Sequence, residues 1–72
     1  MEMTVAEKVR LVAQRKGIKL YVLAERTGQS RQNLSNKLGN DDFTERQMRE
    51  LAGALDCDLQ INFIDRETGE TI

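Results

Sequence analysis

The chain has 72 residues, with 11 Lys and Arg against 12 Asp and Glu, no His, no Pro and one Cys, for a formal net charge of −1. One domain fits in this length, and it buries only about 60% of its unfolded surface. The core is therefore small, and association with a second chain would stabilise the fold. The lone Cys57 excludes an internal disulfide, and the lack of His excludes Cys/His catalysis and zinc sites. No apolar run reaches the roughly 18 residues of a membrane span, so we expect a soluble cytoplasmic protein without enzyme activity, metal or cofactor.

A first helix is predicted from residue 5. Thr4 and Glu7 have the spacing of a capping box, in which two side chains satisfy two free backbone N–H groups. The apolar residues that follow predict its inward face: Val5, Ala6, Val9, Val12 and Ala13. Gly17 ends this helix. Arg15 and Lys16 near its end suit the negative pole of the helix dipole, and a phosphate contact is an alternative role that is compatible with the first.

Two short helices are predicted on either side of a turn at residues 27–29. One apolar face at helical spacing defines the first of them: Leu20, Leu23, Ala24 and Thr27. Gly28 ends it, because glycine tolerates the left-handed conformation of a C-terminal turn. Ser30 stands at the N-cap of the next helix, whose buried anchors are Leu34 and Leu38. The rest of that helix is polar, so it offers a face to a partner.

This stretch resembles the helix-turn-helix of the Cro and lambda-repressor (XRE) family. The resemblance covers roughly residues 5–56 and is carried by Leu23, Ala24, Gly28, Ser30, Leu34 and the polar run at residues 31–37. Leu20 stands where the family often has a Gln that touches phosphate. Gln29 stands where a small apolar residue is usual, and it either loosens the turn or adds a polar contact. The resemblance implies a small regulator of transcription, repressor-like, that lays its third helix in the major groove of duplex DNA.

A fourth helix is predicted after a loop at residues 39–42, whose Gly, Asn and Asp residues favour turns. Thr44 and Gln47 form a second capping box. The apolar face of this helix predicts core scaffold: Met48, Leu51, Ala52 and Leu55. Cys57 then follows as a small apolar filler.

From residue 59 the apolar period changes from helical to alternating. Leu59, Ile61 and Phe63 alternate with polar residues, which predicts a half-buried strand, followed by a turn at residues 65–69 and a short return strand. Because a lone two-stranded hairpin is marginal in water, we predict that these three residues form a dimer interface with a second copy. The resemblance points the same way, since Cro-like members dimerise through a C-terminal strand. A hairpin folded back on its own helices is the alternative.

The predicted fold is therefore mainly α. A four-helix lambda-repressor-like helix-turn-helix domain takes residues 1–56, and a C-terminal β-strand or hairpin at residues 57–72 serves dimerisation. Charge divides at nearly the same place, because residues 1–40 hold eight cations against three acids (+5) and residues 41–72 hold three against nine (−6). The field on the contacting face decides binding, so this division is compatible with double-stranded DNA on one side.

The third helix supplies the predicted DNA contacts. Arg31, Gln32 and Asn36 are placed to reach base edges, since Arg pairs with guanine and Gln or Asn with adenine. Side chains predicted to touch phosphate, or to make mixed contacts, are Ser30, Ser35, Lys37, Asn40 and, more weakly, Lys19 and Tyr21. A competing hypothesis is a protein-interaction module, such as an antitoxin, that docks a protein partner on its acidic half.

Overall fold

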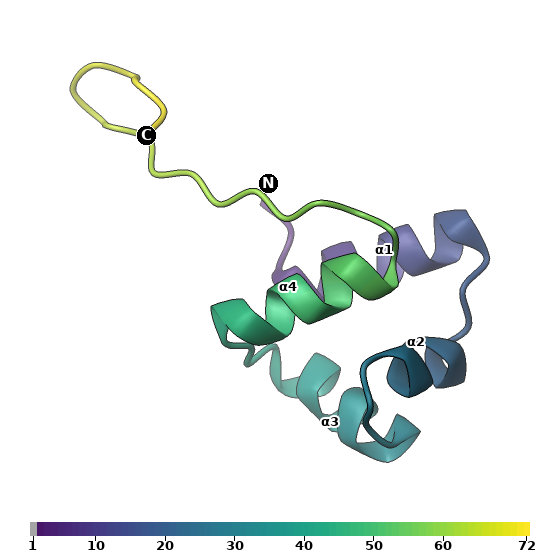
Figure 1. Cartoon of the computed structure of the whole chain (residues 1–72). Helices are drawn as coiled ribbons and strands as arrows, with labels where there is room; N and C mark the ends of the chain where they lie inside the picture. Colours follow the sequence, from purple (N-terminus) through teal and green to yellow (C-terminus); the bar gives the residue numbers. More distant parts are fainter. Residues whose placement is uncertain (1) are drawn as a thin grey trace.

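Four helices make up the folded body in a computed structural model that describes residues 2–72 (Figure 1). They are α1 (Val5–Lys16), α2 (Leu20–Arg26), α3 (Arg31–Asn40) and α4 (Glu45–Ala54). The short α2 and α3 pack on each other, and α4 packs on both α1 and α2. The predicted mainly helical fold is confirmed.

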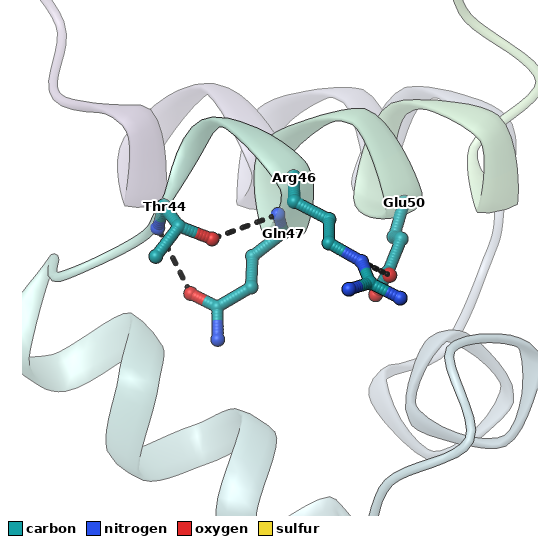
Figure 2. A network of polar contacts seen from close by, with 4 residues as sticks. All are labelled: Thr44, Arg46, Gln47 and Glu50. Atoms are coloured by element: carbon teal, nitrogen blue, oxygen red, sulfur yellow. Dashed lines mark hydrogen bonds and ion pairs between the residues drawn. The ribbon is translucent and has the colours of Figure 1, made fainter.

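Local capping sets where the longer helices begin. The Thr4 hydroxyl accepts a hydrogen bond from the Glu7 N–H at 3.1 Å, and the Glu7 carboxylate accepts one from the Thr4 N–H at 3.3 Å. Thr44 and Gln47 repeat this pattern at 3.1 and 2.9 Å, as Figure 2 shows. Both predicted capping boxes are confirmed. Gly17 ends α1 in the left-handed conformation, at φ +67°, as predicted.

The core draws on every helix. Its buried residues are Ala6, Val9, Leu23, Ala24, Leu34, Leu38, Leu51 and Leu55. The two largest fully buried side chains are Leu23 of α2 and Leu34 of α3, so the centre of the core lies where these two short helices meet. The two helices α2 and α3 are thereby fixed as a unit.

The end of α3 differs from the prediction of a loop at residues 39–42. The helix continues through Asn40, and Asp41 ends it in the left-handed conformation at φ +51°. The Asp41 carboxylate accepts a hydrogen bond from the backbone N–H of Ala6 at 2.8 Å. This bond satisfies a free donor in the first turn of α1 and places a negative charge at the positive end of that helix. A contact between residues 35 positions apart therefore fixes where α3 stops.

Replacing Asp41 with Ala is expected to lower the free energy of unfolding by about 1–2 kcal/mol, because it removes this cap and because Ala tolerates the left-handed conformation less well than Asp. Chemical unfolding followed by circular dichroism measures the change. Asp42→Ala is the matched control, since Asp42 is exposed and makes no hydrogen bond to the described residues. Equal losses in the two variants would contradict the capping role of Asp41.

The C-terminal end of α4 is capped by cations from other helices. The Lys16 ammonium of α1 donates to the carbonyls of Leu55 and Asp56 at 2.8 and 2.9 Å. The Arg26 guanidinium of α2 donates to the Ala54 carbonyl at 2.9 Å. These bonds satisfy carbonyls that the helix leaves without partners. Two of the eight cations in residues 1–40 therefore hold the fold together.

The predicted strand over residues 59–63 is wrong for a single copy. No regular strand occurs in residues 2–72, and the backbone of residues 58–62 makes no hydrogen bond there. Leu59 is half-buried, but Ile61 and Phe63 are exposed, at 46% and 75%. The physical reason is that a strand needs a neighbour to pair with, and the helices offer no sheet edge.

The predicted hairpin is reduced to one antiparallel bridge, between Ile64 and Thr71. It closes a loop of residues 63–72, called here the terminal loop, at the end of the extended segment that leads away from the helices (Figure 1). The molecule is consequently elongated, with extents of 43 × 23 × 23 Å. The alternative of a hairpin packed on its own helices is not seen.

Candidate nucleic-acid interface

The outer side of α3 is a polar surface that is exposed to solvent. Leu34 and Leu38 hold this helix to the core, at 0% and 3% exposure. Its other side chains are exposed except Lys37, which is half-buried. Ten residues are thus anchored by two leucines, and the remaining side chains are available to a ligand.

The three residues predicted to read bases lie within two turns of α3. Arg31 and Gln32 are in the first turn, and the Gln32 amide donates to the Asn36 side-chain oxygen at 3.4 Å. Arg31 makes no hydrogen bond or ion pair with residues 2–72, so its guanidinium is free to meet a planar acceptor. All three side chains are exposed, but only Gln32 and Asn36 share a face, because Arg31 lies one turn before Leu34 on the stripe of the buried leucines. Their contact with DNA stays a prediction.

The predicted phosphate contacts are spread around this face. Ser30 is the N-cap of α3, where its hydroxyl accepts from the Asn33 N–H at 3.0 Å and keeps its own proton free to donate. Ser35 is exposed in the middle of α3 and Asn40 at its last turn. Lys19 and Tyr21 lie at the start of α2, and Lys37 lines a hollow beside α3.

Lys19 is the N-cap of α2 and makes no side-chain capping bond. Tyr21, in the first turn of α2, is 54% exposed. Both side chains are therefore accessible, whereas the Leu20 between them is half-buried and packs against the core. The position at which the family often has a Gln is used here for packing.

Of the two roles expected for Gln29, the structure shows the second: Gln29 adds polar contacts to the turn. Its amide donates to the Thr27 hydroxyl at 2.8 Å and accepts from the Asn33 amide at 2.9 Å. Thr27 in turn donates to the Leu23 carbonyl at 2.9 Å. This chain of bonds ties the end of α2 to the first turn of α3. The sequence signal that could have revealed it is the polar pair Gln29 and Asn33, four residues apart on either side of the Ser30 N-cap.

A polar hollow of about 280 Å³ lies beside α3, between the turn and α4. Its lining comes from the turn, α3 and α4: Thr27, Gln29, Lys37, Phe43, Thr44, Arg46, Gln47, Glu50 and Leu51. Arg46 pairs with Glu50 at 3.3 Å across its edge, as Figure 2 shows. Because both side chains are at least half exposed, this ion pair is weak and Arg46 can exchange its partner. Arg46, for which the sequence predicted no contact, is thus an available cation.

Metal-ligand clusters and membrane-spanning helices are both absent from residues 2–72. Residues 2–72 contain no group of three or more His, Cys, Asp or Glu side chains arranged to hold a metal ion. No helix among them is long and apolar enough to cross a membrane. The chain matches no model of a known protein family, no curated protein and no solved structure in these comparisons. The geometry of α2 and α3 is therefore the feature of the molecule that bears on function.

Proposed function

We propose that this chain is a helix-turn-helix protein of the Cro and lambda-repressor (XRE) type that binds duplex DNA in a sequence-specific way and regulates transcription. The observation that carries the proposal is α3 itself, a helix that buries two leucines and exposes Arg31 in its first turn and the neighbouring Gln32 and Asn36 on its outer face. Side chains of these types, on a helix that fits the major groove, are those that discriminate base pairs there. The proposed location of the protein is the cytoplasm, whose reducing conditions keep the free Cys57 reduced.

The proposed DNA-binding form is a homodimer joined through Leu59, Ile61 and Phe63. A single α3 makes few base contacts, and two recognition helices read successive major grooves when they are held about 34 Å apart. The exposed Ile61 and Phe63, together with the unpaired backbone of residues 58–62, support pairing with a second copy. Antiparallel pairing of these segments across a two-fold axis gives the backbone N–H and C=O groups of alternate residues a partner.

Titration of a duplex with the chain at several salt concentrations tests the DNA proposal directly. Lys19 and Lys37 are assigned to phosphate, so a dimer neutralises about four phosphates, and log K against log salt is expected to fall with a slope of about −3.6. Lys19→Ala is expected to reduce that slope by about 1.8, because the dimer loses two contacts. Fluorescence anisotropy of a labelled duplex gives both slopes.

Arg49→Ala is the matched control for this titration. It removes the same charge from α4, where Arg49 pairs with Glu45 at 3.1 Å and is not assigned to DNA. The slope is expected to stay as in the unchanged chain. A slope near zero for the unchanged chain would contradict the electrostatic part of the proposal.

A second candidate function is an antitoxin-like module that holds a protein partner. It is favoured by the apolar groove between α1 and α4, which the chain itself leaves partly open, and by the acidic balance of residues 41–72. Recovery of a stable stoichiometric protein partner, together with no preference among duplex sequences, supports this function over the first.

A further inference from the structure

The half-buried polar side chains of this fold gather in one place. Among residues 2–72, every half-buried residue is apolar except four: Thr27, Gln29, Lys37 and Gln47. All four line the polar hollow of about 280 Å³ beside α3. A polar group that is drawn back from water needs a hydrogen-bond partner, because its desolvation costs free energy.

Only half of this set is satisfied from within the described part of the chain. The Gln29 amide donates to the Thr27 hydroxyl at 2.8 Å. The Gln47 side-chain oxygen accepts from the Thr44 N–H at 2.9 Å, but its NH₂ group donates no hydrogen bond there. The Lys37 ammonium donates none either, although Lys37 is the one cation in residues 2–72 that is not exposed. Two free donors therefore line the hollow.

Arg46 adds a second cation at the rim of the hollow. Its Nε lies 3.3 Å from a Glu50 carboxylate oxygen, and its two terminal nitrogens make no hydrogen bond within residues 2–72. Figure 2 shows the Arg46 guanidinium and the Gln47 amide on the same side of α4. The charged side chains of the lining are two cations against one carboxylate, a net +1. Free donors and positive charge together suit an anion.

The chemistry of these donors favours a particular anion. Ammonium and guanidinium groups bind phosphate oxygens through charge-assisted hydrogen bonds. A phosphate monoester has a charge of about −1.5 to −2 at pH 7 and three acceptor oxygens, one for each of Lys37, Arg46 and Gln47. A phosphodiester, as in the backbone of DNA, has a single charge and one free oxygen fewer.

The size of the hollow limits the rest of the ligand. Small-molecule sites typically measure about 300–1,000 Å³, and this hollow is smaller, at about 280 Å³. Phe43 and Leu51 give its lining an apolar part, against which a small organic group packs. A compact phosphorylated molecule therefore fits better than a nucleic-acid chain, which has to leave the hollow on both sides of its phosphate.

We propose that the polar hollow is a binding site for a small phosphomonoester, whose phosphate group is held by Lys37, Arg46 and Gln47. Glu50 lowers the affinity of this site, because it competes with the phosphate for the Arg46 guanidinium. Lys37 is also assigned to the phosphates of DNA, so the site is tested without DNA, where no duplex competes for this side chain.

Titration of the ¹⁵N-labelled chain with methyl phosphate, followed by two-dimensional NMR at constant ionic strength, tests this proposal. The expected result is a saturable shift of the Lys37 backbone signal and of the Gln47 side-chain NH₂ signals. Dimethyl phosphate is the matched control ligand, a diester that is expected to give no saturation. Equal binding of the two ligands would assign the hollow to a backbone phosphate and overturn the proposal. Saturation with neither would overturn it as well, whether or not the chain binds DNA.

Three variants test the assigned residues. Lys37→Met is expected to weaken methyl phosphate binding about tenfold or more, because it removes a charged donor and keeps the length of the side chain. Glu50→Gln is expected to tighten binding about two- to fivefold, since it releases Arg46 from an exposed ion pair. Glu45→Gln is the matched control, because it breaks the equivalent pair with Arg49 on α4, outside the hollow. Circular dichroism checks that each variant is folded.

The two glutamate variants keep the proposal open to contradiction even if Lys37→Met does not fold. Equal effects of Glu50→Gln and Glu45→Gln on methyl phosphate binding would overturn the assignment to the hollow. Unchanged binding by a folded Lys37→Met chain would overturn it too.

Discussion

Replacing Ile61 with Lys is expected to give a folded monomer whose affinity for its preferred DNA site falls about 10²–10⁴-fold, the range lost when two linked contacts become independent. Ile61 is at the centre of the segment proposed to pair, so a lysine there places two ammonium groups against each other across the two-fold axis. The helices do not depend on this residue, which is 46% exposed in a single chain. Helix content by circular dichroism is therefore expected to be kept.

Gln60→Lys is the matched control, since it adds the same charge one residue away, on the other face of the same segment. It is expected to leave the dimer intact. Sedimentation of the unchanged chain at micromolar concentration provides the reference. A strict monomer with full affinity for its DNA site would show that the C-terminal segment serves only its own chain.

Replacing Arg31 or Gln32 with Ala is expected to weaken binding to the preferred site by about 1–3 kcal/mol and to relax the preference at one base pair in each half-site. Both residues lie in the first turn of α3, directly after the Ser30 cap, and both side chains are exposed. Anisotropy titrations with the preferred duplex and with single-base variants of it separate the two effects.

Arg10→Ala is the control for charge, because it removes a cation from the exposed side of α1 and no base contact is assigned to it. If the Arg31 and Gln32 variants lose affinity equally for every duplex sequence, these residues contact phosphate and the assignment of base recognition to them is wrong.

The helices and their caps were predictable because their signals are local. A capping box such as that of Thr4 and Glu7 spans four residues, and the apolar spacing of one helix spans about two turns. The exposed positions of Gln32 and Asn36 followed from the same spacing, since Leu34 and Leu38 fix which side of α3 is buried. Arg31 shares the spacing of the two leucines and is exposed because it is the first residue of the helix.

The contacts that join distant segments could not be predicted from the sequence. Asp41 reaches the first turn of α1 over 35 positions, and Lys16 reaches the end of α4 over 39 and 40. Helical spacing does not show which charged residue will meet a helix end in another part of the chain. Counting Lys16 and Arg26 with the cations available to phosphate therefore overstated the charge that DNA can meet.

The strand at residues 59–63 failed for another reason. Alternation at Leu59, Ile61 and Phe63 reports which residues are suited to one buried face, but a strand forms only when a second strand supplies hydrogen-bond partners. Within residues 2–72 only Phe63 of this segment finds such a partner, in Ile72, so the alternating pattern is present without a strand. The same observation makes a second copy the partner to be tested.

Selection of bound sequences from a pool of random duplex DNA is the most direct measurement of the central claim, that α3 reads DNA as part of a two-fold dimer. The expected result is enrichment of an inverted repeat whose half-sites are one helical turn apart, with a spacing of about 34 Å. Enrichment that disappears in the Arg31→Ala variant would assign the contact to α3. A pool that remains random after repeated selection, under conditions in which the chain is folded, would contradict the claim.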